Sequence, residues 1–236
     1  MKHSATEVVQ TARRQIARQA AGNRFLDLLE DGAVPRPRLA DLVGELYLLV
    51  GSDRRSFALL ASRFPTSPAG DLFLAMAVGE GEALRLLLDF AAALDLDEDD
   101  LRRHEPTPLA QAYPAYLAQT ALFGTRSNVA LALLANVEES SQNYTRAADA
   151  LREHYGFPEQ VLGHFRYFAD TPPELLDQAA ITLEDGLAAG DDPVEAVRTA
   201  RMVHAYEAMF WGALAEGLGD HGPATRATDS TRIRTG

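Results

Sequence analysis

The chain contains no cysteine. This absence excludes a disulfide framework, a zinc or iron–sulfur site with cysteine ligands, and a cysteine nucleophile. Long apolar runs are also missing, because a stretch such as residues 46–50 is far too short to span a bilayer. The first residues lack the apolar segment of a signal peptide. We therefore expect a soluble, cytoplasmic protein without a membrane partner.

Positive charge is in the minority: 22 Lys and Arg stand against 34 Asp and Glu, which gives a formal net charge of −12. Proteins that bind nucleic acid or anionic lipid usually present a basic surface. No helix-turn-helix pattern is evident either. The composition therefore predicts no nucleic-acid partner. A chain of 236 residues can also bury a sizeable core without a disulfide or metal.

Ala and Leu dominate the sequence, whereas Val, Ile and Thr rarely alternate with polar residues as they do in strands. Clusters of Gly and Pro separate the helical stretches. The predicted helices cover residues 5–30, 38–63, 68–94, 108–123, 126–155, 158–169, 173–188 and 192–218. Because no long linker divides them, we expect one all-α domain over residues 1–218. Residues 219–236 have few apolar side chains and are predicted to be disordered.

Candidate functional residues are polar side chains at positions where the helical period demands apolar ones. In the last predicted helix, His204 and Glu207 interrupt an apolar stripe spaced by three and four residues. A carboxylate there must be paired, hydrogen-bonded or facing a cavity, because burying it alone costs several kcal/mol. Glu207 is thus either half of a structural ion pair or a pocket group, and we favour the pocket. His204 is interpreted equally well as a core histidine.

Ser140 and Tyr144 interrupt a similar stripe in the 126–155 helix, with Glu138 and Glu139 beside it. Each alone has a structural explanation, since a buried Ser can bond the carbonyl four residues back and a buried Tyr needs one partner. Together with Glu207 they predict a polar cavity between helices.

Other candidates are less distinctive. Glu45 is a lone acid in an apolar stretch, either solvated or in a pocket, and aromatic clusters around Tyr113 and Phe168 are either pocket walls or ordinary core. The sequence has no Gly-rich phosphate loop, no serine nucleophile elbow and no His pair at zinc spacing. No cofactor or metal is therefore expected.

Two segments resemble the TenA/PqqC group. Residues 25–35 resemble its opening short helix followed by Gly-x-x-Pro, and Tyr206-Glu207-Ala208-Met209-Phe210-Trp211 resembles its Glu-x-x-Phe-Trp signature. The resemblance implies a haem-oxygenase-like fold, with seven or eight helices around one central pocket, in a homodimer or homotetramer.

The resemblance also implies roles for single residues, since TenA proteins of the thiaminase II type hydrolyse C–N bonds of aminopyrimidines in thiamin salvage. Glu207 falls on the family's proton-transfer Glu, Tyr144 on a pocket Tyr and Ser140 on the catalytic Cys. The remaining matches are Tyr113 on another pocket Tyr, Glu45 on an Asp that holds the pyrimidine, and Leu48 and Phe168 on two further Tyr positions. One branch of the family has a Glu in place of the Cys, which Glu138 or Glu139 could supply.

Serine is a weaker nucleophile than a thiolate, so efficient thiaminase activity is not expected. The di-iron oxidases of the same fold need three His ligands that residues 79–85 and 168–175 lack. The favoured reading is a metal-free C–N hydrolase or acid/base catalyst on an aminopyrimidine-like or other heteroaromatic compound, with Phe168 and Trp211 as pocket walls. The alternatives are a PqqC-like or atypical metal-dependent oxidase of a biosynthetic pathway, and a binding protein without catalysis.

Overall fold

The computed structural model describes residues 4–18 and 22–218, and within that part every regular element is a helix. Its α-helices are α1 (Ala5–Ala17), α2 (Arg24–Glu30), α3 (Arg38–Arg63), α4 (Ala69–Ala92), α5 (Glu98–Arg102), α6 (Ala112–Phe123), α7 (Arg126–Tyr155), α8 (Gly163–Ala169), α9 (Pro173–Ala189) and α10 (Pro193–Leu214), with a 3-10 turn, η1 (Glu159–Val161). The all-α prediction is confirmed. The tail predicted to be disordered lies outside the described residues.

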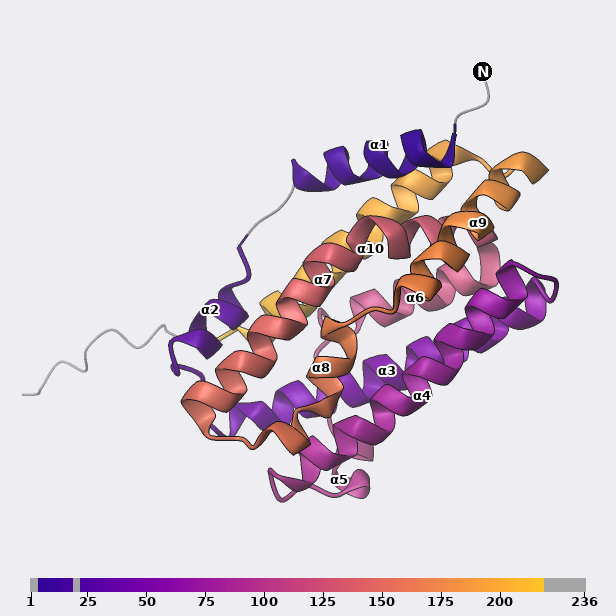
Figure 1. Ribbon diagram of the computed structural model, residues 1–236. Helices are drawn as coiled ribbons and strands as arrows, with labels where there is room; N and C mark the ends of the chain where they lie inside the picture. Colours follow the sequence, from indigo (N-terminus) through magenta and orange to yellow (C-terminus); the bar gives the residue numbers. More distant parts are fainter. Residues whose placement is uncertain (1–3, 19–21, 219–236) are drawn as a thin grey trace, which may run out of the picture.

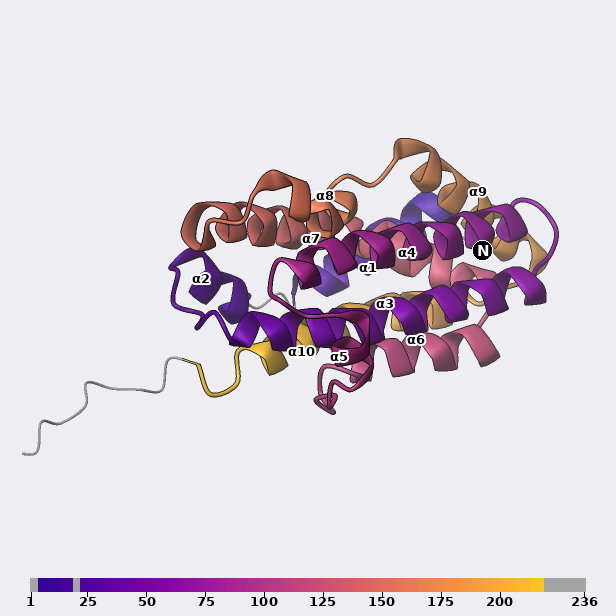
Figure 2. The same cartoon turned by 90° about the horizontal axis from the view of Figure 1, so that it is seen from below.

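The long helices run along one common direction, as Figures 1 and 2 show. Helix α3 packs mainly against α4 and α6, while α7 packs against α10, α9 and α8. Helix α1 lies across α10 and α7, and α2 packs against the second half of α7. None of the helices in residues 4–18 and 22–218 is both long and apolar enough to cross a membrane.

Local capping sets the helix boundaries and explains one difference from the prediction. The stretch predicted as one helix over residues 5–30 is two helices, because the Asn23 side chain accepts from the Leu26 N–H and starts α2. The acidic residues 95–100, whose composition is typical of a solvated helix start or loop, contain the start of α5, which begins with a capping box between Asp97 and Asp100. Gly156 ends α7 in the left-handed conformation with φ 71°.

Buried apolar side chains form two clusters along the bundle. One contains Phe25, Phe90 and Trp211, and the other contains Phe57, Phe73 and residues of α9 and the first half of α10. Tyr113 packs against both clusters. The polar site described below therefore lies where the two clusters meet.

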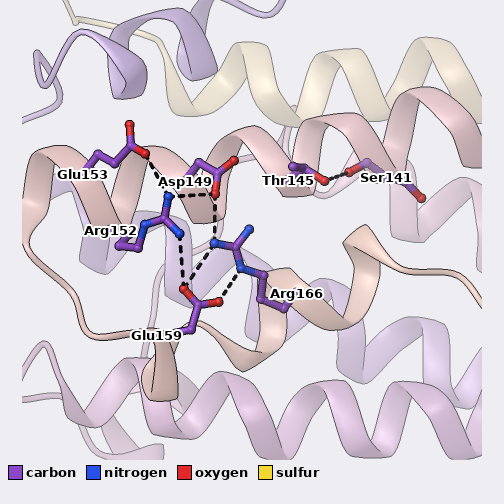
Figure 3. A network of polar contacts seen from close by, with 7 residues as sticks. All are labelled: Ser141, Thr145, Asp149, Arg152, Glu153, Glu159 and Arg166. Atoms are coloured by element: carbon purple, nitrogen blue, oxygen red, sulfur yellow. Dashed lines mark hydrogen bonds and ion pairs between the residues drawn. The ribbon is translucent and has the colours of Figure 1, made fainter.

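A network of ion pairs fastens α8 to α7 (Figure 3). Arg166 contacts Asp149 at 2.9 Å and Glu159 at 2.6 Å, and Arg152 lies 3.5 Å from Asp149. These charges are partly exposed, so each pair adds little stability. Their combined effect is to fix the orientation of α8, which carries Phe168 into the site.

Candidate active site

Two small cavities lie between α3, α4, α6, α7, α8 and α10. The smaller, of about 80 Å³, is lined by Leu49, Asp53, Glu80, Tyr113, Ser140, Tyr144, Phe168, Glu207, Phe210 and Trp211. The larger, of about 150 Å³, shares five of these residues, namely Glu80, Tyr113, Ser140, Phe168 and Glu207. We call the two cavities together the central site. A cavity of roughly 150 Å³ is large enough to hold one benzene-sized ring.

Glu207 on α10 lies at the centre of this site. Burial raises the pKa of its carboxyl to about 7, although the Ser140 hydrogen bond and the nearby His204 lower it. The Trp211 indole, whose buried Nε1 has no hydrogen-bond partner of ordinary geometry, also lies close enough to lower this pKa. A carboxyl with a pKa near 7 can both accept and release a proton at neutral pH.

Asp53 on α3 is a site residue that the sequence analysis missed. It is 3% exposed, and its Oδ1 has no hydrogen-bond partner. Burial raises the pKa of its carboxyl well above the usual value and the Glu207 charge raises it further, while a hydrogen bond from Tyr113 lowers it. The signal was present in the sequence, because Asp53 falls in an apolar stripe between Val50 and Phe57.

Glu80 on α4 is the third carboxylate of the site and was also missed. Its Oε2 is buried without a hydrogen-bond partner, and burial together with the Asp53 charge raises its pKa well above the usual value. Glu80 follows Phe73 by seven residues and precedes Leu87 by seven, so it too interrupts an apolar stripe.

Tyr113 and Tyr144 bring phenol groups to the same space. Burial and the surrounding carboxylates raise the pKa of both hydroxyls well above the usual value, so both stay protonated and can donate hydrogen bonds. The Tyr144 ring packs against Phe168 and Trp211, with ring centroids 4.9 Å and 5.8 Å apart. The lining of the site therefore combines aromatic rings with carboxyl groups.

The structure brings together six of the nine residues singled out from the sequence: Glu207, Ser140, Tyr144, Tyr113, Phe168 and Trp211. Glu138 is exposed on α7, and Leu48 is half-buried on α3. Neither lines the central site. The expected positions of Glu138 and Leu48 in the pocket are therefore corrected, because both side chains lie on other faces of their helices.

Glu45 also lies elsewhere. Its carboxylate is 1% exposed and accepts hydrogen bonds from the Thr107 N–H at 2.6 Å and from Gln111 Nε2 at 2.5 Å, with His104 Nε2 at 3.3 Å. It thus fastens the segment between α5 and α6 to α3. The expectation that Glu45 holds a ligand is corrected, since Asp53, two turns further along α3, is the acid of this helix that faces the cavity.

We expect Glu45→Ala to lower the free energy of unfolding by about 1–3 kcal/mol, because two donors lose their acceptor in a buried place. Urea denaturation monitored by circular dichroism measures this change. Asp41→Ala is the matched control: Asp41 lies one turn earlier on α3, is 47% exposed and pairs only with Arg38, and it should change stability by less than about 0.5 kcal/mol. Equal effects of the two substitutions would contradict the role of Glu45.

A separate pocket of about 100 Å³, the outer pocket, lies on the far side of Glu207 and is lined by Asn23, Asn136, Glu139, Asn143 and His204 among others. His204 Nε2 lies 3.0 Å from the carboxylate of Glu139. His204 is thus a buried histidine with a partner, and Glu207 borders both the central site and the outer pocket. A larger groove of about 300 Å³ between α1 and the first turns of α10 contains none of the central-site residues.

Within the described part of the chain, no group of three or more His, Asp or Glu side chains is placed so that it could hold a metal ion. The three carboxylates of the central site are thus arranged around a cavity and do not converge on one point.

Comparison with known proteins identifies the family and fold of the chain. The model of the TENA/THI-4/PQQC family matches residues 12–215. A TenA homologue protein from P. horikoshii OT3 is 19% identical, with a TM-score of 0.66 over 90% of this chain and 98% of that one. A TenA homologue from Pyrococcus furiosus is 18% identical, with a TM-score of 0.61 over 89% and 99%.

A domain of unknown function with a heme oxygenase-like fold, from Shewanella denitrificans, is 16% identical, with a TM-score of 0.52 over 91% and 94% of the two chains. Among curated proteins nothing matches. The family match covers most of the chain, and the structural matches agree with it in fold. The chain therefore belongs to the TENA/THI-4/PQQC family and has a haem-oxygenase-like fold.

Proposed function

We propose that this protein is a small-molecule enzyme that hydrolyses a C–N bond, or carries out a related acid/base reaction, on an aminopyrimidine-like or other heteroaromatic compound. The observation that supports it most strongly is Glu207, a carboxyl with a pKa of about 7 that faces a cavity of single-ring size with Tyr113 and Phe168 in its lining. Membership of the TenA-like family supports the substrate class.

The proposed reaction needs only water as co-reactant. Glu207 in its acid form gives its proton to the departing nitrogen, and the electron pair of the breaking C–N bond goes to that nitrogen. Water adds to the carbon and returns a proton to the Glu207 carboxylate, which restores the starting state. Ser140 orients this carboxylate through its hydrogen bond.

The phenol groups have complementary roles in this scheme. Tyr144 is a protonated donor that stabilises negative charge on the reacting group. Tyr113 donates its hydroxyl hydrogen to Asp53 and so positions that carboxyl at the cavity. Phe168 and Trp211 form the aromatic walls against which a ring would stack.

A parallel assay tests the proposal. The full chain is incubated with aminopyrimidines that carry aminomethyl or formylaminomethyl substituents, while proton NMR follows amine release and an oxygen electrode follows dioxygen. We expect amine release without dioxygen uptake. Dioxygen uptake coupled to substrate loss would indicate an oxidase instead, and tight binding without turnover would indicate a binding protein.

A further inference from the structure

We propose that Asp53 and Glu80 together form a two-carboxylate subsite that binds a cationic or amidine-like N–H edge of the ligand. This inference rests on the proposal that the central site is where substrate binds. It assigns a specificity-determining role to Glu80 and narrows the ligand to nitrogen bases that carry at least two N–H donors or a positive charge.

The first argument is the state of the carboxylate oxygens. Asp53 Oδ1 and Glu80 Oε2 are both buried, both belong to residues that line the smaller cavity, and neither has a hydrogen-bond partner. A buried acceptor without a donor is costly, so native proteins rarely leave two of them side by side. A ligand with two N–H groups would satisfy both oxygens at once.

The second argument is the charge of the lining. Asp53, Glu80 and Glu207 line the central site, and none of its described lining residues is Lys, Arg or His. Burial raises the pKa of all three carboxyls, so their ionised forms are costly while no cation is present. A bound cation stabilises the ionised forms by direct pairing, whereas a carboxylate or phosphate finds no positive partner in this lining.

The third argument is how closely neighbouring side chains pack around Glu80. Glu80 lies between Gly79 and Gly81, and side chains of neighbouring helices come close to the backbone of both glycines. A Cβ at residue 79 would lie 2.5 Å from the Tyr167 hydroxyl, and one at residue 81 would lie 3.2 Å from the Arg54 guanidinium carbon. The two glycines therefore let α8 and α3 pack tightly on either side of Glu80 and hold its backbone in place.

The ligand class follows from these features taken together. The acids accept from a planar N–H edge, while the rings of Tyr144, Phe168 and Trp211 receive an aromatic plane and favour positive charge on it. An aromatic amidine, or a heteroaromatic ring with an amino group beside a protonated ring nitrogen, has this combination.

Three probes of equal shape test the subsite: benzamidine is a cation, benzamide is neutral and benzoate is an anion. Binding is followed by the fluorescence of Trp211, which is the single tryptophan of the chain and lines the cavity. We expect the full chain to bind benzamidine at least about tenfold more tightly than benzoate. Glu80→Gln should weaken benzamidine about 10–100-fold and change benzamide by less than about threefold.

The matched control is Glu82→Gln, two residues further along α4. Glu82 is 46% exposed, pairs with Arg85 at 2.7 Å and lies outside the cavity lining, so its substitution should leave all three affinities unchanged. Asp53→Asn is the second test variant and should act in the same direction as Glu80→Gln. Circular dichroism melting verifies that each variant is folded.

Benzoate binding as tight as benzamidine, no benzamidine binding up to about 10 mM, or an unchanged preference in both Glu80→Gln and Asp53→Asn would each overturn the subsite. These readouts need no turnover, so they separate the two proposals. Full turnover in Glu207→Gln with loss of benzamidine binding in Glu80→Gln would refute the proposed reaction and leave the subsite standing.

Discussion

Glu207→Gln is expected to lower kcat by about 10²–10⁴-fold on any substrate that the protein turns over, because the amide cannot exchange the proton that the reaction needs. The shape of the side chain is retained, so binding should weaken much less than kcat. The wild-type pH profile should show an inflection near pH 7, where the Glu207 carboxyl titrates. This inflection should be absent from the residual activity of the variant.

The same substitution should stabilise the fold at alkaline pH. The folded-state pKa of Glu207 is about 7, above the ordinary 4.5, so as the pH rises through this interval the unfolded chain releases a proton that the folded chain still holds. Folding stability is therefore lost between about pH 4.5 and 7, and the loss persists above. We expect Glu207→Gln to melt at a higher temperature than wild type at pH 8 and at nearly the same temperature at pH 4.

Glu195→Gln serves as the control for both measurements. Glu195 lies on the same helix, is half-exposed and pairs with Arg198, so its substitution should leave kcat and the pH profile unchanged. A kcat for Glu207→Gln within about tenfold of wild type would show that Glu207 is not the proton-transfer group.

Phe90→Ala is expected to produce a large loss of stability, about 3–5 kcal/mol. Phe90 is 0% exposed, and its ring meets Phe157 and Phe165 edge-on, with centroid distances of 4.9 Å and 5.1 Å. Truncation of the ring opens a cavity between α4, α8 and the segment that follows α7. The loss is large because the packed helices can fill this cavity only in part. Since small domains have about 5–15 kcal/mol of stability in total, this loss is large.

Urea denaturation measures this loss, with Phe123→Ala as the matched control. Phe123 is the last residue of α6 and is 80% exposed, so its truncation should change the free energy of unfolding by less than about 0.5 kcal/mol. A loss below about 1 kcal/mol for Phe90→Ala would mean that the cluster collapses around the missing ring.

The sequence predicts the helical class and much of the site because α7 and α10 are long and strongly periodic. In such helices a polar residue on the apolar stripe stands out, and Ser140, Tyr144 and Glu207 were found in this way. The same criterion applied to α3 and α4 would have found Asp53 and Glu80, since both interrupt apolar stripes.

Other features depend on contacts between segments far apart in the sequence. Glu45 is buried only because Thr107 and Gln111, more than sixty residues later, fold back onto α3. The local sequence pattern around Glu45 contains no sign of these distant partners. Periodicity alone therefore does not distinguish an acid that lines a pocket from one that binds a distant loop. The division at Asn23 was missed for a simpler reason, because one capping side chain decides it.

The walls of the central site are also part of the buried core. Tyr144, Phe210 and Trp211 belong to the larger apolar cluster and line the smaller cavity at the same time. Glu80 and Ser140 line it as well but lie outside both apolar clusters and are only partly buried. Divergence of this protein toward other substrates is therefore least constrained at positions 80 and 140, where a new side chain can alter the chemistry of the cavity without dismantling the scaffold that shapes it.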